Sequence, residues 1–434
     1  MMRTLLKNGT VIDPVNNIRG QYDILIEGKH IINIKKEIKP ENCQVIKLEG
    51  KVVIPGLIDM HTHLREPGYE EKETIITGCE AAAAGGFTTI ACMPNTRPVA
   101  DNPATVEYIK SKAREAVVKV LPVGSITKNL EGKELAEIGF LARAGVCGLS
   151  DDGNPVMNSE IMRRAMEYAR AFDLPIISHC EDLDLVGDGV MNEGYYSTIL
   201  GLKPIPAAAE EVMISRDIIL ADFTGARLHI DHLSTRKGVE MVARAKEKGL
   251  RVTAEVTPHH LILTDKAVKG YNPNTRVNPP LRSSEDRAAL RQGIKEGIID
   301  VIATDHAPHT FEDKLGEYDY AENGISGLET ALSLIYDRLI KTGEISWEDL
   351  VRLMVINPSE IVGVKAEGIK RYARADITIF DPDRTWQVNP ENFKSKGKNT
   401  PFADWELTGK VVMTIVDGKI VYDDRSGNNE VLYR

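Results

Sequence analysis

Val-Val-Ile-Pro-Gly-Leu-Ile, residues 52–58, leads within two residues into His-Thr-His-Leu-Arg-Glu-Pro-Gly, residues 61–68. Because side chains alternate along a strand, His61 and His63 point to the same face and can bind one metal ion together. Arg65 continues the same line and can meet an anion beside that metal. The stretch therefore predicts metal-assisted hydrolysis of a substrate that carries a carboxylate or a phosphate.

Short apolar runs recur along the chain, and helix-like segments separate them. Eight strand–helix alternations favour a (β/α)₈ barrel, an α/β fold built on a parallel barrel. An open doubly wound sheet is the alternative, which the absence of a GxGxxG motif after the first strand disfavours. The eight predicted strands are Val52–Ile58, Phe87–Met93, Val117–Val123, Val146–Leu149, Pro175–Ser178, Arg227–Ile230, Arg251–Val256 and Asp300–Ala303. The predicted helices include Lys72–Ala84, Ala104–Ala116, Ser159–Ala171, Ala207–Ala221, Lys237–Glu247 and Glu285–Glu296, with Ser159 and Ser284 as N-caps and Gly85 and Gly297 as stops.

Both ends of the chain have a different pattern, with short alternating strands and tight turns. We expect them to meet in one small composite β-sandwich domain, residues 1–53 plus 366–434, beside a catalytic barrel of residues 54–365. The acidic stretch Thr310–Gly327 follows the eighth predicted strand and has little apolar periodicity. It is expected to form a mobile loop at the active site.

Composition excludes several classes of function. The chain has 434 residues and a net charge of −10 without a long basic run, so nucleic-acid binding has no electrostatic support. No apolar run approaches the ~20 residues that a bilayer span needs. Its five cysteines are scattered, which disfavours a thiolate zinc site and predicts a reduced, cytoplasmic protein.

Nearly every predicted strand ends in a side chain that can bind a metal. Barrel enzymes carry their catalytic groups at the carboxyl ends of the strands, so these residues should converge on one mouth. His61, His63 and Asp305 can hold one ion, and His179 and His232 a second, with Asp152 or Asp151 as the bridging carboxylate. Nitrogen and oxygen ligands suit Zn²⁺, with Mn²⁺ or Co²⁺ conceivable. Two such ions would lower the pKa of a bound water and create a hydroxide, whose proton Asp305 could pass to a leaving nitrogen.

The other histidines have simpler interpretations. His229 lies three residues before His232, so on a strand it should face the other way and have a structural role. His259 and His260 are expected to pack behind the site, and His306 should point away from it. His309, on the loop after the eighth strand, could reach a substrate.

The motifs Asp-Met-His-Thr-His-Leu-Arg-Glu-Pro-Gly (59–68), Met-Pro-Asn-Thr (93–96) and Ala-Thr-Asp-His-Ala-Pro-His (303–309) resemble those of dihydroorotases, in the amidohydrolase superfamily. The bacterial type I enzymes are the most similar subgroup, and the resemblance covers nearly the whole chain. It implies a barrel with a composite β domain, and the reversible cyclisation of N-carbamoyl-L-aspartate to dihydroorotate in de novo pyrimidine synthesis. In that family the reaction uses a hydroxide bridging two zinc ions.

The resemblance also implies roles for individual residues. Asp152 resembles the bridging carboxylate that replaces a carboxylated lysine in this subgroup, and Asp305 the catalytic acid/base and metal ligand. Arg65 and Asn95 resemble clamps on the substrate carboxylate, with His309 assisting. The substrate-binding set implied by position is His63, Arg65, Asn95, Asn278, His309, Asn323 and Gly324, where Asn323 stands in place of a usual phenylalanine.

Three alternatives are weighed. Dihydropyrimidinases and hydantoinases share the barrel, but they use a bridging lysine and need no carboxylate clamp. Allantoinases share a similar loop, yet Arg65 and the 93–96 motif favour dihydroorotase. A non-catalytic barrel that supports a partner enzyme would have lost metal ligands, whereas all of them are present here. A homodimer and an association with aspartate transcarbamoylase are expectations from the family.

Overall fold

The computed structural model describes residues 3–425, 427 and 429–432. Eight parallel strands form its barrel, as predicted. They lie in two hydrogen-bonded groups, β6-β7-β8 and β15-β14-β13-β10-β9, which parallel bridges join at Gly124↔Leu149 and Thr62↔His306. The barrel is therefore closed, and no open doubly wound sheet forms. The barrel strands are β6 (Leu57–Thr62), β7 (Phe87–Cys92), β8 (Lys119–Pro122), β9 (Leu149–Ser150), β10 (Ile176–Ser178), β13 (Leu228–Ile230), β14 (Val252–Val256) and β15 (Val301–Ile302).

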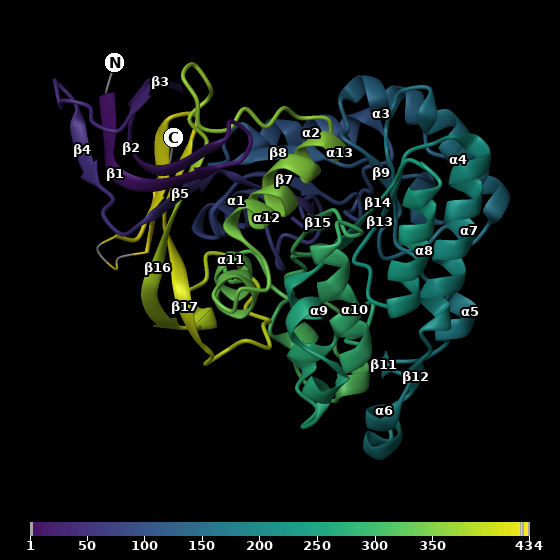
Figure 1. Ribbon diagram of the computed structural model, residues 1–434. Helices are drawn as coiled ribbons and strands as arrows, with labels where there is room; N and C mark the ends of the chain where they lie inside the picture. Colours follow the sequence, from purple (N-terminus) through teal and green to yellow (C-terminus); the bar gives the residue numbers. More distant parts are fainter. Residues whose placement is uncertain (1–2, 426, 428, 433–434) are drawn as a thin grey trace.

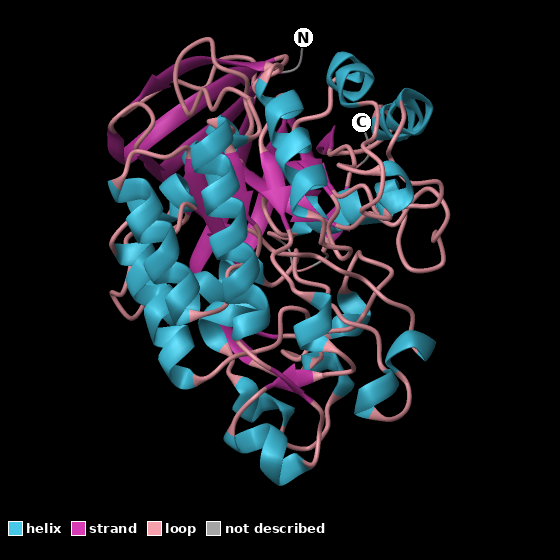
Figure 2. Cartoon of the chain, turned by 90° about the vertical axis from the view of Figure 1, so that its right-hand side faces the viewer, coloured by secondary structure: helices cyan, strands magenta, loops and turns pink. Residues whose placement is uncertain are grey.

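A helix returns the chain after each barrel strand, and Figure 2 shows these helices around the central strands. The N-caps lie one residue earlier than predicted: Asn158 accepts hydrogen bonds from two backbone N–H groups, and Ser283 forms a capping box with Asp286. Ser159 and Ser284 are the first helical residues instead. The main helices are α1 (Ile75–Ala84), α2 (Pro103–Ala113), α3 (Ile138–Ala144), α4 (Ser159–Arg170), α7 (Ala208–Thr224), α8 (Arg236–Glu247), α10 (Ser284–Lys295) and α11 (Ala331–Ile335).

Shorter helices and strands lie within the loops, and some of them continue the last helices. The short helices and strands are α5 (Leu183–Val186), β11 (Met191–Asn192), α6 (Tyr195–Leu200), β12 (Pro204–Ile205), α9 (Pro258–Ile262), α12 (Trp347–Val351) and α13 (Asn357–Ile361). Two π-helical segments, Tyr336–Ile340 and Arg352–Ile356, extend α11 and α12. Short 3₁₀ segments are Lys128–Leu130, Asp265–Val268, Pro273–Thr275, Glu312–Lys314, Tyr318–Tyr320 and Pro390–Asn392. No helix among the described residues is long and apolar enough to cross a membrane.

Strands from the two ends of the chain share one sheet beside the barrel, and Figure 1 shows the purple N-terminal strands next to the yellow C-terminal ones. Its order is β19-β18-β17-β16-β5-β1-β2-β3, with β4 paired to β1. The proposed domain limits stay a prediction; β5 spans the limit between residues 53 and 54. The strands are β1 (Arg3–Asp13), β2 (Ile18–Glu27), β3 (His30–Lys35), β4 (Gln44–Lys47), β5 (Val52–Pro55), β16 (Ile377–Gln387), β17 (Glu406–Val416), β18 (Lys419–Asp423) and β19 (Glu430–Val431).

The first predicted strand, 52–58, divides at Gly56 into two strands of different sheets. β5 pairs with β1 and β16, whereas β6 begins the barrel. A Cβ atom on Gly56 would lie 2.2 Å from the side chain of Thr88, so only glycine lets the chain pass between the two sheets here. Because β6 starts at Leu57, its carboxyl end places His61 at the mouth of the barrel.

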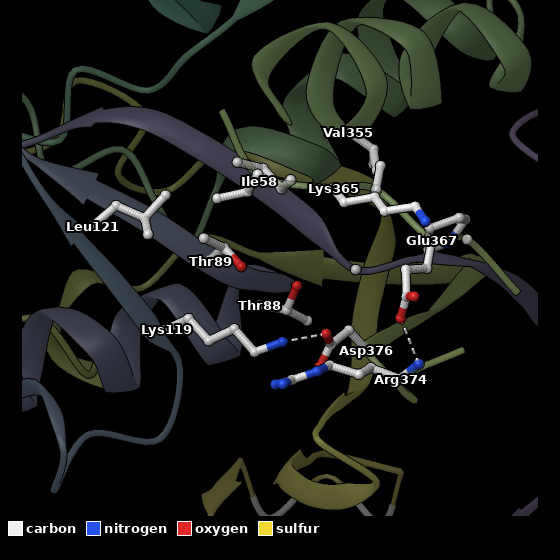
Figure 3. Close-up of a pocket in the computed structure, with 15 residues that line it drawn as sticks. Ile58, Thr88, Thr89, Lys119, Leu121, Val355, Lys365, Glu367, Arg374 and Asp376 are labelled. Carbon is white, nitrogen blue, oxygen red and sulfur yellow. Dashed lines mark hydrogen bonds and ion pairs between the residues drawn. The ribbon is translucent and has the colours of Figure 1, made fainter. Parts of the chain in front are cut away.

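A cavity of about 410 Å³ lies at the opposite end of the barrel, against the first residues of β6, β7 and β8 (Figure 3). Lys119 forms an ion pair with Asp376 there, and the backbone N–H of Arg374 donates to Glu367 at 3.0 Å. None of the metal-competent groups found among the described residues lies in this cavity. Barrel enzymes do not carry their catalytic groups at the amino ends of the strands, so the active site is expected at the carboxyl ends.

Candidate active site

The predicted metal ligands converge at the carboxyl ends of the barrel strands. His61 lies near the end of β6 and His63 just after it, Asp152 follows β9, and Asp305 follows β15. His179 comes directly after β10, and His232 lies two residues beyond β13. Asp305 and His232 have positive φ angles of 47° and 29°, a strained conformation that is typical of residues held in place for function.

Asp152 is the centre of this arrangement. Its carboxylate oxygens lie 3.4 Å from a ring nitrogen of His63 and of His179, 3.5 Å from His232 and 3.6 Å from His61. Asp151 instead accepts hydrogen bonds from the backbone N–H groups of residues 126 and 127, at 2.8 and 3.0 Å. Of the two carboxylates that the sequence left open, only Asp152 faces the histidines.

The spacing around Asp152 fits a metal centre. The distances of 3.4–3.6 Å exceed ordinary N–H···O hydrogen bonds. They match the edge of a tetrahedron of ligands about 2.0–2.1 Å from zinc, which is about 3.3–3.4 Å. Nε2 of His61 and Oδ1 of Asp152 are buried without a hydrogen-bond partner among the described residues. A bound cation would satisfy these atoms, which the protein itself does not.

Three groups of side chains among the described residues are close enough to share an ion. His61, His63 and Asp305 form one, and the Asp305–His63 contact is 3.0 Å. His179 and His232 approach each other at 2.9 Å on the other side of Asp152. Another group joins His61 to Asp152, Asp231 and His232, so the division into a first and a second metal position made from the sequence stays a prediction.

The electrostatics of the site show why it needs positive charge. Burial opposes ionisation of Asp305, but the charges of His61 and His63 outweigh it and lower the pKa of its carboxyl. Burial likewise disfavours the charged form of His179, yet Asp152 and Glu181 raise its pKa to about 10. A proton on His179 thus compensates the neighbouring carboxylates, and a metal ion would displace it on binding.

Sequence reasoning missed a second layer of buried carboxylates. Oε1 of Glu255 lies 2.6 Å from Nδ1 of His61, and Oε2 lies 3.2 Å from Nε2 of His229. Asp231 is fully buried beside them, and Glu181 lies 3.2 Å from His179. The sequence did hold a signal for Glu255, because a glutamate within the apolar run 251–256 is expected to be buried. A buried charge is costly unless a partner compensates it, so such a residue indicates a buried polar site.

The expected orientation of His229 is wrong. His229 contacts Glu255, which in turn contacts His61, so its ring lies on the side of the metal ligands. The strand β13 ends at Ile230, and the positive φ of His232 breaks the alternation on which the expectation relied. His229 still has a structural role, since its other ring nitrogen bonds Thr253 at 2.8 Å.

The remaining histidines agree better with their interpretations. His260 hydrogen-bonds Thr257 and the carbonyl of Pro279, and His306 contacts Glu73 and accepts from the backbone N–H of Gly327. Both are packing residues. His259 and His260 lie in the short helix α9 and not on a strand, so strand alternation does not apply to them.

A cavity of about 150 Å³ opens over the cluster. This volume is well below the ~300–1,000 Å³ of sites for drug-sized ligands, which points to a small substrate. Every predicted substrate-binding residue except His309 lines the cavity, and so does every predicted metal ligand except His61. Its predicted lining residues are His63, Arg65, Asn95, Asp152, His179, His232, Asn278, Asp305, Asn323 and Gly324.

Arg65 is the cation of this cavity. Its Nε donates to the carbonyl of Pro308 at 3.2 Å, and no carboxylate lies within ion-pair distance among residues 3–425. A guanidinium without an acidic partner at a cavity wall is a site for an anion. Asn95 lies nearby, where its Oδ1 contacts Nδ1 of His63 at 3.0 Å.

Asn278 presents a free acceptor. Its Nδ2 donates to Glu181 at 3.0 Å, whereas Oδ1 is buried without a partner among the described residues. A ring N–H group could satisfy it. The backbone of Asn323 and Gly324 is less available than expected, because Gly324 N–H donates to Arg276 and Gly324 C=O accepts from Asn399.

His309 lies behind the cavity and not in its wall. Lys72 donates to Nδ1, so we assign the proton to Nε2, which donates to the carbonyl of Asn323 at 2.8 Å. Burial and the positive charge of Arg65 lower the pKa of His309 and keep it neutral. Nη2 of Arg65 lies 3.3 Å from Nε2 of His309, and because both atoms then carry protons this is a packing contact and not a hydrogen bond.

Comparison with known proteins agrees with this geometry. The dihydroorotase of Syntrophus aciditrophicus (strain SB) is 54% identical over 426 residues, which cover 98% of this chain and 100% of that protein. The dihydroorotase of Thermoanaerobacter sp. (strain X514) is 56% identical over 97% of each chain. A family model described as Dihydro-orotase-like matches residues 50–238.

The chain belongs to the dihydroorotase family.

Solved structures place this dihydroorotase-family fold among cyclic amide hydrolases. The L-hydantoinase (dihydropyrimidinase) from Arthrobacter aurescens aligns with a TM-score of 0.89 and 26% identity, covering 100% of this chain and 98% of that one. The dihydropyrimidinase from Brevibacillus agri NCHU1002 aligns with a TM-score of 0.86 at 23% identity, which compares the fold alone. The protein is thus an amidohydrolase-superfamily enzyme of a metal-dependent family, with buried His and Asp groups able to hold metal.

Proposed function

We propose that the protein interconverts N-carbamoyl-L-aspartate and (S)-dihydroorotate with release or uptake of water, a step of de novo pyrimidine synthesis. The observation that carries this proposal is the unpaired Arg65 in the wall of a small cavity over the His/Asp cluster. A cyclic amide with a ring carboxylate satisfies both features. The identity of 50–56% to relatives named dihydroorotase over nearly the whole chain supports it.

We further propose that the site binds two zinc ions. His61, His63 and Asp305 would hold the first, His179 and His232 the second, and Asp152 would contribute one oxygen to each. When bound, the ions would lower the pKa of a water molecule and polarise the scissile carbonyl. Four imidazoles and two carboxylates, without a thiolate, suit zinc chemically.

The remaining steps depend on side chains of the chain itself. Arg65 and the Nδ2 group of Asn95 bind the substrate carboxylate, and Oδ1 of Asn278 accepts a hydrogen bond from a ring N–H. In hydrolysis, water adds to the ring amide carbonyl and the bond to the ring nitrogen breaks. Asp305 takes the proton from the attacking water and gives it to the leaving nitrogen. The synthetic direction reverses these transfers.

The test is an assay of one preparation with dihydroorotate, dihydrouracil and hydantoin, combined with elemental analysis. Turnover of dihydroorotate with about two zinc ions per chain is the expected result. One ion with full activity would remove the bridging role of Asp152. Turnover of dihydrouracil or hydantoin, with none of dihydroorotate, would contradict the proposal and assign the cyclic amidase activity of the structural neighbours.

Three further predictions concern the surroundings of the enzyme. A homodimer and an association with aspartate transcarbamoylase follow from the family resemblance, and a cytoplasmic location from the five scattered cysteines. Light scattering of the purified protein, with and without the transcarbamoylase, tests the first two. Fractionation of the source cells tests the third.

A further inference from the structure

The carboxyl group of Asp231 is buried at the metal-site cluster and has no hydrogen-bond partner. Its side chain is 0% exposed, and neither Oδ1 nor Oδ2 has a partner among the residues that the structure describes. Oδ1 lies 3.7 Å from Nδ1 of His61, too far for a hydrogen bond. The mechanism proposed above does not use this residue.

Asp231 is unusual among the buried acids of the chain. Asp151 accepts three hydrogen bonds, and Asp217 binds both Ser178 and Arg216. Burying a carboxylate without any such partner is costly, so a residue like Asp231 needs a compensating charge. Its surroundings identify where that charge would come from.

Two metal-competent groups include Asp231. One of its oxygens lies within 4.8 Å of ligand atoms of His61, Asp152 and His232, and a second group combines it with His229 and Glu255. Asp231 therefore lies beside His61, which is proposed for the first ion, and His232, which is proposed for the second.

Both oxygens of Asp231 are buried without a hydrogen-bond partner among the described residues, beside residues that could hold a metal ion. A divalent cation bound at the cluster would supply the positive charge that this carboxyl group otherwise lacks.

We propose that Asp231 is a positioning residue of the metal centre, whose buried and unpartnered carboxyl group helps to retain the bound cations. This inference rests on the proposed function, because it assumes that the cluster is a two-metal site. It adds a residue outside the expected set of ligands, and it assigns to that residue an effect on metal affinity and not a contact with substrate.

The test is metal retention by Asp231→Asn, which keeps the shape of the side chain and removes its charge. Zinc content is measured after dialysis against graded concentrations of a chelator, without any activity assay. We expect the variant to lose zinc at a chelator concentration about 10- to 100-fold lower than wild type, the usual effect of losing a residue that supports metal ligands. Equal retention of both ions would overturn the proposal.

Asp151→Asn is the matched control. It neutralises another buried carboxylate, which is next to Asp152 in the chain and whose hydrogen bonds go to backbone N–H groups outside the cluster. It should change thermal stability but not zinc retention. If zinc retention falls equally in both variants, the effect is a general loosening of the barrel and the proposal is wrong.

Thermal unfolding supplies a second, independent signature. Because the carboxyl group of Asp231 is unpartnered without metal, metal-free Asp231→Asn should be at least as stable as metal-free wild type, whereas the zinc-loaded variant should be less stable. A residue that only packs would lower both melting temperatures. Asp231→Ser provides the same comparison if the asparagine variant does not fold.

These measurements separate the inference from the proposed function. If wild type binds two zinc ions but does not turn over dihydroorotate, the function fails and the role of Asp231 is still decided by zinc retention. If wild type turns over dihydroorotate and Asp231→Asn retains zinc equally, the function stands and the inference fails.

Discussion

Replacement of Arg65 by lysine tests the substrate assignment most directly. Arg65→Lys keeps the positive charge but loses the planar fork that binds a carboxylate through two hydrogen bonds. It also loses the Nε donor that anchors the side chain to Pro308 at 3.2 Å. Lysine at this position can reach the carboxylate through one bond at most.

The size of the effect follows from the number of hydrogen bonds that the substitution removes. One charge-assisted hydrogen bond contributes about 1.5–3 kcal/mol, which corresponds to a loss of about 10- to 150-fold in kcat/KM. The carboxylate clamp lies away from the scissile bond, so its loss misplaces the ring and should lower kcat as well as raise KM. Zinc content should not change, because Arg65 is not among the metal-competent groups.

The assay is steady-state hydrolysis of dihydroorotate, with elemental analysis of the same samples. Arg276→Lys is the control, since Arg276 is a neighbouring arginine that donates to the carbonyl of Tyr318 and does not line the cavity. A kcat/KM within twofold of wild type for Arg65→Lys would refute the carboxylate clamp. A loss of zinc in that variant would show that Arg65 acts on the metal centre instead.

Three further outcomes are expected. Asp305→Ala should lower kcat by at least 10²-fold, because it removes the proton-transfer group; an unchanged rate in the zinc-loaded variant would exclude Asp305 from the chemistry. Glu255→Gln should weaken zinc binding about 10- to 100-fold in a chelator titration, since Glu255 orients His61 through a 2.6 Å contact; unaltered binding would contradict this. Burial, followed by the nearby charge of Arg276, lowers the pKa of Lys314 to about 7. The unfolded chain keeps that proton up to about pH 10.4, so Lys314 should make the free energy of unfolding rise between pH 7 and 10, by at most about 4 kcal/mol. In denaturant titrations at several pH values, Lys314→Met should remove this rise. If the free energy of unfolding of the variant depends on pH as that of wild type does, the role of Lys314 is refuted.

The candidate site could be predicted in large part because its ligands occupy equivalent positions on successive strands. His61, His179 and Asp305 each stand where an apolar run ends, and a parallel barrel brings those ends together. The second layer could not be predicted in this way. Asp231 and Glu255 lie within or next to apolar runs, and nothing local indicates whether such a side chain faces the metals, a helix or another strand.

Boundaries were less predictable than elements. The run 52–58 has uniform apolar character, so its division at Gly56 between two sheets depends on the approach of Thr88, which is distant in sequence. The N-caps at Asn158 and Ser283 differ from the predicted ones by one residue, because adjacent asparagine and serine residues are both good caps.

By itself, the sequence determined the barrel, the residues that end its strands and the family. These follow from two-residue and helical periodicities and from motifs that are local in the chain. Only the tertiary structure decided which carboxylate faces the histidines, which backbone groups near Gly324 are already bonded, and where an unpartnered acid lies beside the metal-competent side chains. Those features depend on contacts between residues far apart in sequence, whose distances no local pattern encodes.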